Sequence, residues 1–436
     1  MCFKALRIFI GERPLLGSLW LKDGFMNFGL DIEDVLKLNA KGEIPGKSGL
    51  VIDIRPEADF KRSSFPGAIS LPCLLAGEVA DEKLQEFCTK LTKILVEMFP
   101  DRCRDSESVK KFPVFLFSHA GRQSETLCEK LRNVGFNATN ILGGWRKMVR
   151  IDLEKRVENE EERAKEQKSI EKSIIKTYHV DIWSPFIRAL KAYELVNEGD
   201  RVMVCMSGGK DSFVLAKLFQ ELAKHKKVNF SACFVVMDPG YNPENRKIIE
   251  YNARLLGIPV EIFETKIFDS VENIEKNPCY LCARMRRGYL YRAAMERGCN
   301  KIALGHHFDD AIETVLMGML YAGKFETMMP KLHSRNFPGM ELIRPMYMIR
   351  EEAIEGWRDF NRLSFIQCAC NFTDKIADFG SQMKSSRKET KELIKELSKT
   401  NPSVAANLFK SMENVNLETI LAYKEAGVKH TFLEKY

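Results

Sequence analysis

The segment Ser207-Gly-Gly-Lys-Asp-Ser212 constrains the fold more than any other, because it joins an apolar run to a helical pattern. The run Arg201–Met206 is typical of a buried strand, and residues 213–222 show the apolar spacing of a helix. A glycine-rich turn in this place aims backbone N–H groups and the positive end of a helix at an anion. The segment does not match the Walker phosphate loop. We predict a phosphate-binding turn, with an ordinary strand-to-helix turn as the alternative.

Length, charge and composition limit the number of domains and the classes of partner that we expect for this chain. With 436 residues the chain is long enough for two or three domains, and its hydrophobic content of 45% is ordinary. Its net charge of +7 is compatible with nucleic acid as a partner but does not require it. No apolar run approaches ~18 residues, so we expect no membrane association. Twelve cysteines without a regular framework favour a reducing, cytoplasmic location, where clustered cysteines indicate metal or redox chemistry.

The pattern divides the chain into five parts. Residues 29–150 and 178–380 alternate strand and helix signals, which predicts two α/β domains with parallel sheets. Mixed charges over residues 151–177 indicate a solvated linker helix. We expect an N-terminal extension over residues 1–28 and a helical region without strands over 381–436. Expected strands lie at 50–54, 113–117, 202–206, 230–237, 260–264 and 301–304.

The first domain resembles the rhodanese family. The resemblance rests on Val51-Ile-Asp-Ile-Arg55, Phe65-Pro-Gly-Ala-Ile69 and Leu142-Gly-Gly-Trp145. Rhodaneses carry a persulfide on a cysteine, and the corresponding position here is Ser118. An alcohol forms no stable persulfide and lacks the reactive thiolate. We therefore expect a rhodanese fold that has lost turnover and that docks a sulfur donor or helps to hold the substrate.

Three further motifs follow the glycine-rich turn. Cys279-Tyr-Leu-Cys282 and Cys368-Ala-Cys370 offer up to four thiolates, a pattern that fits zinc, an iron–sulfur cluster or a redox pair. The sequence Gly305-His-His-Phe-Asp-Asp310 comes directly after an expected strand, where open α/β sheets place their ligands.

With these motifs the second domain resembles the tRNA 2-thiocytidine synthetase family of ATP pyrophosphatases over about residues 178–425. Five motifs agree in order: SGGKDS, CxxC followed by Arg286-Arg-Gly288, GHHxDDxxET, Met329-Pro-Lys331 and Ile343-Arg-Pro345. The resemblance implies an enzyme that adenylates the C2 carbonyl of a pyrimidine in tRNA, with an anticodon-loop cytidine as the expected target, and replaces its oxygen with sulfur. It implies ATP, Mg²⁺ and a 4Fe–4S cluster as cofactors, and tRNA and a sulfur donor such as a cysteine desulfurase as partners. It leaves a homodimer open.

Residue roles follow from the same resemblance. Arg286 and Asp310 are the expected catalytic residues, with a phosphate contact for Arg286 and a helix cap for Asp310 as alternatives. His306 and His307 are expected to shape the site. Expected nucleotide-binding residues are Ser207, Gly208, Gly209, Lys210, Asp211, Ser212, Asp238 and Gly305. Expected cluster ligands are Cys279, Cys282 and Cys368, with Cys370 as an alternative third ligand and a four-cysteine zinc site as the rival interpretation.

Basic and aromatic residues interleave between positions 284 and 292. Arginine side chains bind phosphate well, and aromatic rings stack on extruded bases, so we expect this stretch to contact tRNA. Its basic and aromatic residues are Arg284, Arg286, Arg287, Tyr289, Tyr291 and Arg292. Two other functions stay open. One is an adenylating ligase or amidotransferase of the same superfamily acting on a small molecule, and the other is a zinc-stabilised RNA-binding scaffold without catalysis.

Overall fold

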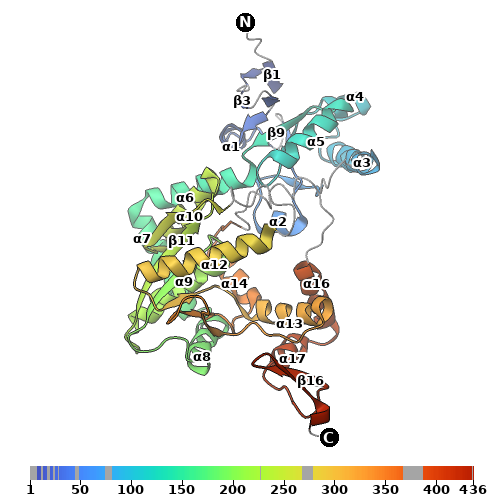
Figure 1. The fold of residues 1–436 in the computed structure, drawn as a ribbon. Coiled ribbons are helices and arrows are strands. Elements are labelled where there is room, and N and C mark those ends of the chain that lie inside the picture. The colour runs from blue at the N-terminus through green and yellow to red at the C-terminus, as the bar shows by residue number, and fades with distance from the viewer. Residues whose placement is uncertain are drawn as a thin grey trace.

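The computed structural model describes residues 29–44, 49–73, 81–225, 227–267, 278–366, 386–434 and 436, together with the backbone of four short strands near the N-terminus. These strands form two antiparallel pairs: β1 (Arg7–Ile10) with β2 (Arg13–Leu16), and β3 (Trp20–Lys22) with β4 (Phe25–Asn27). Two larger α/β units follow along the chain (Figure 1).

The first α/β unit has a five-stranded, entirely parallel sheet in the order β5-β9-β8-β6-β7. Its strands are β5 (Gly29–Asp31), β6 (Leu50–Asp53), β7 (Ile69–Ser70), β8 (Val114–Phe117) and β9 (Ala138–Leu142). Its helices are α1 (Ile32–Ala40), α2 (Glu57–Arg62), α3 (Asp81–Met98), α4 (Ser106–Lys111) and α5 (Arg122–Asn133).

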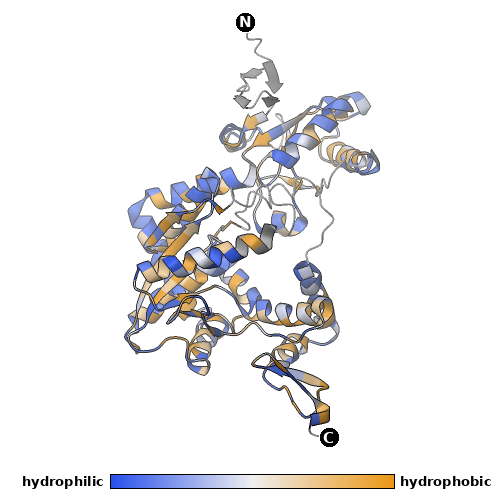
Figure 2. Cartoon of the chain, viewed as in Figure 1, coloured by the Kyte–Doolittle hydropathy of each residue, from blue (hydrophilic) through white to orange (hydrophobic). Residues whose placement is uncertain are grey.

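Both faces of this sheet are buried at its centre, which explains why β8 is apolar throughout and β6 is apolar except for Asp53 (Figure 2). Leu116 lies in the core beside α3 and α5, whereas its neighbours Phe115 and Phe117 belong to a second, larger core. That second core continues without a break into the other α/β unit, through Leu153, Ile174 and Phe213 among others. The two units are therefore packed on a shared apolar interior.

The segment expected to be a solvated linker helix is helical, but the expectation that it is solvated on all sides is wrong. Residues 151–177 form most of α6 (Gly144–Glu158) and α7 (Glu160–Ile175), and one side of each helix is buried. Polar contacts hold α6 to α10 (Pro243–Leu256): Arg150 Nε lies 2.9 Å from Glu244 Oε2, and Tyr251 donates to Glu154 Oε1 at 2.7 Å. Arg156 of α6 pairs with Glu166 of α7, whereas Lys155, Glu158 and the acidic residues 160–162 are exposed, as expected of a solvent face.

The second α/β unit has a six-stranded sheet in the order β12-β11-β10-β13-β15-β14, parallel except for β14. The strands are β10 (Arg201–Met206), β11 (Ser231–Asp238), β12 (Val260–Glu264), β13 (Lys301–Ala303), β14 (Lys331–His333) and β15 (Glu341–Ile343). The chain first moves outward from β10 to β12 and then returns to the other side at β13. This reversal creates the kind of crevice in which open α/β sheets bind ligands.

Helices cover both faces of this sheet, and α12 runs along its front in Figure 1. They are η1 (His179–Trp183), α8 (Ser184–Ala192), α9 (Lys210–Lys224), α10, α12 (Pro278–Glu296), α13 (Phe308–Ala322) and α14 (Glu351–Phe360). Among the described residues, no helix is long and apolar enough to cross a membrane.

The C-terminal region contains α16 (Ser386–Thr400) and α17 (Val404–Ser411), which contact α13. It also contains an antiparallel hairpin of β16 (Ala422–Glu425) and β17 (Val428–Thr431), followed by η2 (Phe432–Glu434). The expectation of a region without strands is wrong here. The hairpin side chains are mostly exposed, so the periodic burial that marks a strand in sequence is missing.

Candidate active site

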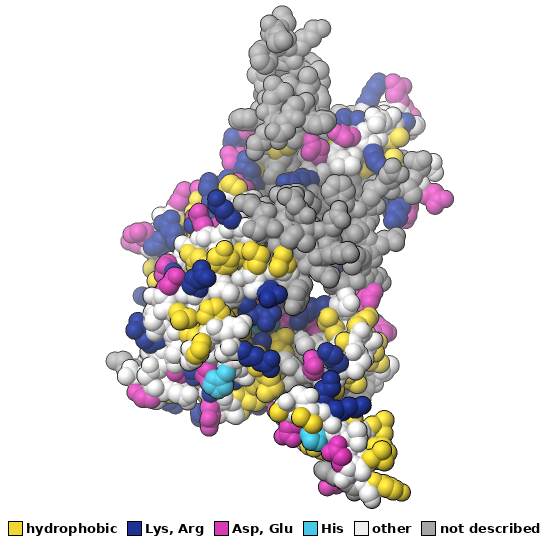
Figure 3. All heavy atoms as spheres, in the orientation of Figure 1, with side chains coloured by type: hydrophobic (Ala, Val, Ile, Leu, Met, Phe, Trp, Pro, Cys, Tyr) yellow, Lys and Arg dark blue, Asp and Glu magenta, His cyan; other side chains and the backbone are white. Residues whose placement is uncertain are grey.

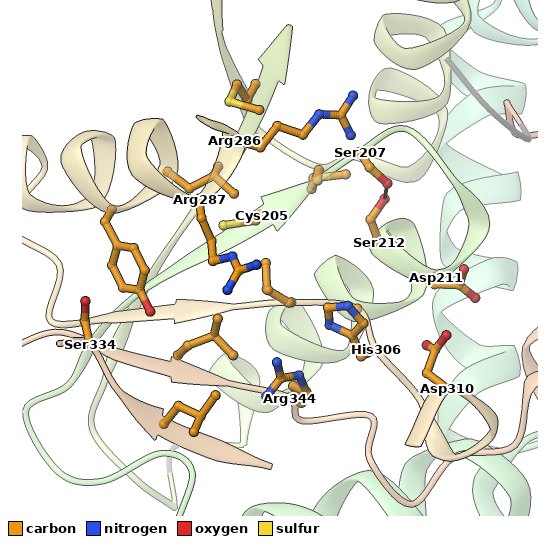
Figure 4. A pocket seen from close by; sticks show the side chains of 18 of the residues that line it. Cys205, Ser207, Asp211, Ser212, Arg286, Arg287, His306, Asp310, Ser334 and Arg344 are labelled. Carbon is orange, nitrogen blue, oxygen red and sulfur yellow. Dashed lines mark hydrogen bonds between the residues drawn. The ribbon is translucent and has the colours of Figure 1, made fainter. Parts of the chain in front are cut away.

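A cavity of about 900 Å³ opens at the carboxyl ends of β10 and β13, where the sheet order reverses (Figure 4). The site therefore lies where the fold itself predicts one. The predicted residues that line it are Ser207, Asp211, Ser212, Arg286, Gly305 and Asp310. On the face seen in Figure 3, Lys and Arg side chains gather in the middle of the molecule, where Figure 1 places α12 and α13.

The backbone of the glycine-rich turn has a left-handed conformation at Gly208, which favours glycine there. Gly208 has φ +85°, and a Cβ placed there would lie 2.6 Å from Ile366 Cδ1 and 2.7 Å from Ile249 Cγ1. Gly209 caps the N-terminus of α9, and the Ser212 hydroxyl donates to its carbonyl at 2.8 Å. The first N–H groups of α9 have no partner within the helix, so an anion at this end of the cavity is favoured.

Gly305 brings the loop after β13 against this turn. A Cβ at Gly305 would lie 3.2 Å from the Asp211 carbonyl carbon and from the Ser212 nitrogen. The absence of a side chain thus allows two loops from neighbouring strands to meet at the floor of one cavity.

His307 lies between two carboxylates of the site. Its Nε2 is 3.5 Å from Asp310 Oδ2 and 3.9 Å from Asp211 Oδ1. Asp310 Oδ2 also accepts from the His307 backbone N–H at 3.0 Å, so the helix-capping interpretation of Asp310 is confirmed. Its other oxygen is 3.0 Å from Arg387 Nη2. Capping and a chemical role are compatible, because Asp310 still lines the cavity.

His306 also lines the cavity, as its predicted role in shaping the site requires. Burial lowers the pKa of His306 to about 4, and the nearby Arg344 and Arg387 act in the same direction against Asp310. A neutral imidazole is therefore the stable form of His306 at neutral pH.

Four arginines line the cavity: Arg286 and Arg287 from α12, Arg335 from the segment between β14 and β15, and Arg344 after β15. In Figure 4 the Arg286 side chain extends from α12 toward Ser207, and Arg287 extends toward His306 and Arg344. Burial lowers the pKa of Arg344, which follows β15. The sequence assigned no role to Arg344 by itself, although it belongs to the quoted Ile343-Arg-Pro345 motif. Its place in that motif was the signal that could have identified it.

Lys210 lies beside the site rather than in it. Its Nζ is 3.0 Å from Asp211 Oδ1 and 3.0 Å from Glu351 Oε1, and it is not among the residues lining the cavity. Glu351 also pairs with Lys391. Burial acts to raise the pKa of Glu351, but Lys210 and Lys391 outweigh it and hold the pKa at about 2. In this structure Lys210 therefore joins α9 to α14.

Glu351→Gln should remove a pH-dependent contribution to stability. Because the folded pKa is lowered, the contribution is present above the unfolded value near ~4.3 and is lost as pH falls toward 2. We expect urea unfolding at pH 7 to show a loss on the order of 2 kcal/mol, shrinking toward zero at pH 2–3. Glu352→Gln, at an exposed neighbouring position, is the control. An equal loss at both pH values would contradict the electrostatic origin.

The Asp238 carboxylate is engaged by neighbouring protein groups. One carboxylate oxygen accepts from the backbone N–H groups of Gly240 (2.9 Å) and Tyr241 (2.7 Å). The other accepts from Arg246 Nη1 at 2.7 Å. Asp238 is not among the residues lining the cavity, whereas Tyr241 is, and Tyr241 Oη donates to the Ser207 carbonyl at 3.2 Å. Asp238 thus shapes the turn that positions Tyr241.

The predicted cluster ligands lie largely outside the described residues. Positions 279 and 282 fall in the first turns of α12, but their side chains are not described, and Cys368 and Cys370 lie outside the described ranges altogether. In the helix backbone, positions 279, 282 and 286 share one face. Within the part of the chain that is described, no group of three or more His, Cys, Asp or Glu side chains is arranged to hold a metal.

The side chain of Ser118 in the rhodanese-like loop is held by hydrogen bonds within the domain. The Ser118 hydroxyl accepts from Gly121 N–H at 3.1 Å and lies 2.8 Å from Ser124 Oγ, which donates to Asn140 Oδ1 at 2.6 Å. Ser118 is only 1% exposed. A buried alcohol held in this network has neither the thiolate nor the access that a sulfur nucleophile needs.

Comparisons with known proteins agree with both α/β units. Residues 31–150 match the rhodanese-like domain and residues 184–377 match the PP-loop domain. The tRNA-cytidine(32) 2-sulfurtransferase of Anaeromyxobacter dehalogenans is 37% identical over 231 residues, which cover 52% of this chain and 76% of that protein. The enzyme of the same name from Alkalilimnicola ehrlichii is 39% identical over 52% of this chain and 70% of its own length.

Among solved structures, the U34-tRNA thiolase NcsA from Methanococcus maripaludis with its 4Fe–4S cluster is 22% identical. The match covers 55% of this chain and 80% of that one, with a TM-score of 0.42.

Proposed function

The chain belongs to the tRNA-cytidine(32) 2-sulfurtransferase family of enzymes, and from this membership we propose that it replaces the C2 oxygen of a cytidine in tRNA with sulfur at the expense of ATP. One observation carries the proposal. The Ser207–Ser212 turn and the arginines of α12 face each other across one cavity, so a nucleotide and a nucleobase fit the same site. A cytidine in an anticodon loop is unpaired, so extruding it into the cavity costs little.

ATP would lie with its phosphates against the N-terminus of α9. Gly208 lets the turn pack closely over Ile249 and Ile366, and Ser207 and Ser212 supply hydroxyls at the cavity. Attack of the C2 oxygen on the α-phosphate gives an adenylated base and pyrophosphate. Sulfide then attacks C2, the C2–O bond breaks, and AMP leaves. Arg286, aimed at Ser207, would stabilise the charge that develops between base and phosphate.

Asp211 and Asp310 suit Mg²⁺, because this ion is commonly held by one or two carboxylates together with substrate phosphates. His307 between them orients the two carboxylates. The same arrangement lets Asp310 accept a proton when its contact with Arg387 loosens.

Cys279 and Cys282 with Cys368, or with Cys370 in its place, are proposed to hold a 4Fe–4S cluster. Held by these three thiolates, a bound cluster would supply sulfide for the reaction at the activated base. The fit rests on donor chemistry and on the position of α12, whose first turns carry two of the cysteines and whose next turn carries Arg286. Absorbance near ~400 nm after anaerobic purification tests it, and colourless protein containing stoichiometric zinc would favour the four-cysteine zinc site.

The rhodanese-like domain is proposed to be a docking module without turnover. Its continuous core with the PP-loop domain supports a fixed placement beside the site. The full chain should release no thiocyanate from thiosulfate and cyanide. Sustained turnover that Ser118→Ala abolishes would contradict this assignment.

The decisive experiment is thiolation in vitro. Anaerobic full-length protein is incubated with unmodified tRNA, sulfide and ATP, and digested nucleosides are analysed by mass spectrometry. We expect 2-thiocytidine, together with AMP rather than ADP, and neither without ATP. AMP formation that depends on a small amine or acid instead of tRNA would favour the ligase alternative. Binding of tRNA without AMP formation would favour the scaffold.

A further inference from the structure

A pair of thiols lies outside the candidate site. Cys233 Sγ and Cys299 Sγ are 3.6 Å apart. Cys233 is the third residue of β11, and Cys299 precedes β13 by two residues. Because the strands are parallel, both thiols lie toward the amino ends of the sheet, whereas the cavity lies at the carboxyl ends. The pair is therefore separate from the chemistry proposed above.

We propose that Cys233 and Cys299 are a redox-active dithiol that hydrogen peroxide converts into an intramolecular disulfide. The two sulfur atoms are already in contact, and they must approach from 3.6 Å to about 2.05 Å to bond. Cys233 is half-buried and within reach of a small oxidant, whereas Cys299 is buried. This difference assigns the first reaction to Cys233 and the second to Cys299.

The charges around the pair support that order. The hydrogen bond from Cys299 lowers the pKa of Cys233 to about 7 against the effect of burial, and the Arg297 guanidinium adds to the lowering while Glu261 opposes it. The same hydrogen bond and then burial raise the pKa of Cys299. Arg201 also faces Cys299, and Cys205 faces Cys233 from the neighbouring strand. A thiolate is thus favoured at Cys233, and a protonated donor at Cys299.

The reaction balances with peroxide as the oxidant. The Cys233 thiolate attacks one peroxide oxygen, the O–O bond breaks, and the departing hydroxide takes a proton to become water. Cys233 is then a sulfenic acid. The Cys299 sulfur attacks it, the S–O bond breaks, and the oxygen leaves as a second water with the Cys299 proton. Two thiols lose two electrons in all, and one peroxide becomes two waters.

A disulfide here would tie β11 to the turn between α12 and β13. That turn follows the C-terminal end of α12, the helix whose other half carries Arg286 and Arg287. Oxidation would thereby fasten this helix to the sheet at the end remote from the cavity.

The test uses full-length protein prepared anaerobically and treated with equimolar hydrogen peroxide. Remaining thiols are alkylated, and proteolytic peptides are analysed by mass spectrometry. We expect a linked pair containing Cys233 and Cys299, 2 Da lighter than the two free peptides. In Cys299→Ser the link is lost and Cys233 is trapped as a sulfenic acid by dimedone. Cys88→Ser, which alters another half-buried cysteine, should leave the link intact.

The pH dependence of alkylation gives a second measurement. The midpoint for Cys233 should lie near 7 in the unaltered chain and move above ~8 in Cys299→Ala, because alanine has no donor. Recovery of Cys233 and Cys299 as free thiols while other cysteines are oxidised would overturn the proposal. So would a Cys233 midpoint that Cys299→Ala does not move.

Discussion

Replacing Gly208 by alanine is expected to reduce AMP formation at least ~100-fold and to lower the free energy of unfolding by about 2–4 kcal/mol. Gly208 has φ +85°, and an L-residue in left-handed backbone costs about 1–2 kcal/mol. A Cβ would also lie 2.6–2.7 Å from the side chains of Ile249 and Ile366. Both of these belong to the main core, and forcing an extra methyl group into a packed interior costs about 1–3 kcal/mol.

The loss of activity follows from the position of the turn. If Gly208 moves to relieve the contacts, the N–H groups that follow it no longer converge on the phosphates. We expect kcat/KM for AMP formation to fall at least ~100-fold, which corresponds to about 2.7 kcal/mol of transition-state stabilisation.

Gly209→Ala is the matched control for stability. Gly209 has φ −83°, and its Cβ would lie 3.7 Å from Ile366 O and from Ser207 Oγ, which is ordinary contact. Because glycine is preferred to alanine at the N-cap of a helix, chemical denaturation should show a loss of at most about 1 kcal/mol, smaller than that of Gly208→Ala. If the two alanine variants were equally stable, the strained turn would not be the reason for glycine at 208.

Arg286→Gln is expected to reduce the rate of tRNA thiolation about 100- to 1000-fold while leaving the fold intact. Arg286 lines the cavity and extends toward Ser207, so its charge lies where the base and the phosphate must meet. Removing one such preorganised group from an active site typically costs 10²–10³ in kcat. Glutamine retains hydrogen-bonding capacity and loses only the charge and the forked geometry.

The kinetic pattern separates the two roles of Arg286. A lower kcat at saturating ATP and tRNA indicates stabilisation of the transition state, whereas a higher KM with an unchanged kcat indicates a phosphate contact alone. Arg254→Gln is the control, because Arg254 is exposed on α10 and does not line the cavity. It should change neither constant by more than about twofold. A normal kcat in Arg286→Gln would remove Arg286 from the chemistry.

Local sequence predicted several strands of the second sheet well. The expected strand at 260–264 coincides with β12, and those at 202–206 and 301–304 agree with β10 and β13 within one residue. β13 is buried throughout and β10 is buried after its first residue, so their apolar signals are strong, whereas β12 lies at the sheet edge and is only partly buried. The short strands β7, β14 and β15 were missed, because two or three residues are too few to show a period.

The candidate site was predicted unevenly. Several residues of the quoted motifs, such as Ser207, Gly305 and Asp310, line the cavity, whereas the predicted residues Gly208, Gly209, Lys210 and Asp238 do not. Glu351 engages Lys210 and Arg246 engages Asp238, and those partners are 141 and 8 positions away. Whether a charged group faces a ligand or a neighbouring helix depends on what the fold brings beside it, which a motif does not encode.

The sequence by itself determined the phosphate-binding turn, the two parallel α/β units and the replacement of the rhodanese cysteine by Ser118. These features are local, because each depends on residue types at short spacing. The turn depends on backbone sterics, the α/β units on periodic burial, and Ser118 on the replacement of a sulfur atom by oxygen. Only the tertiary structure decided that the two units share one core, that Arg344 joins Arg286 at the cavity, and that Cys233 meets Cys299. These contacts join residues far apart in the chain, and their geometry is set by the packing of whole strands and helices rather than by any segment alone.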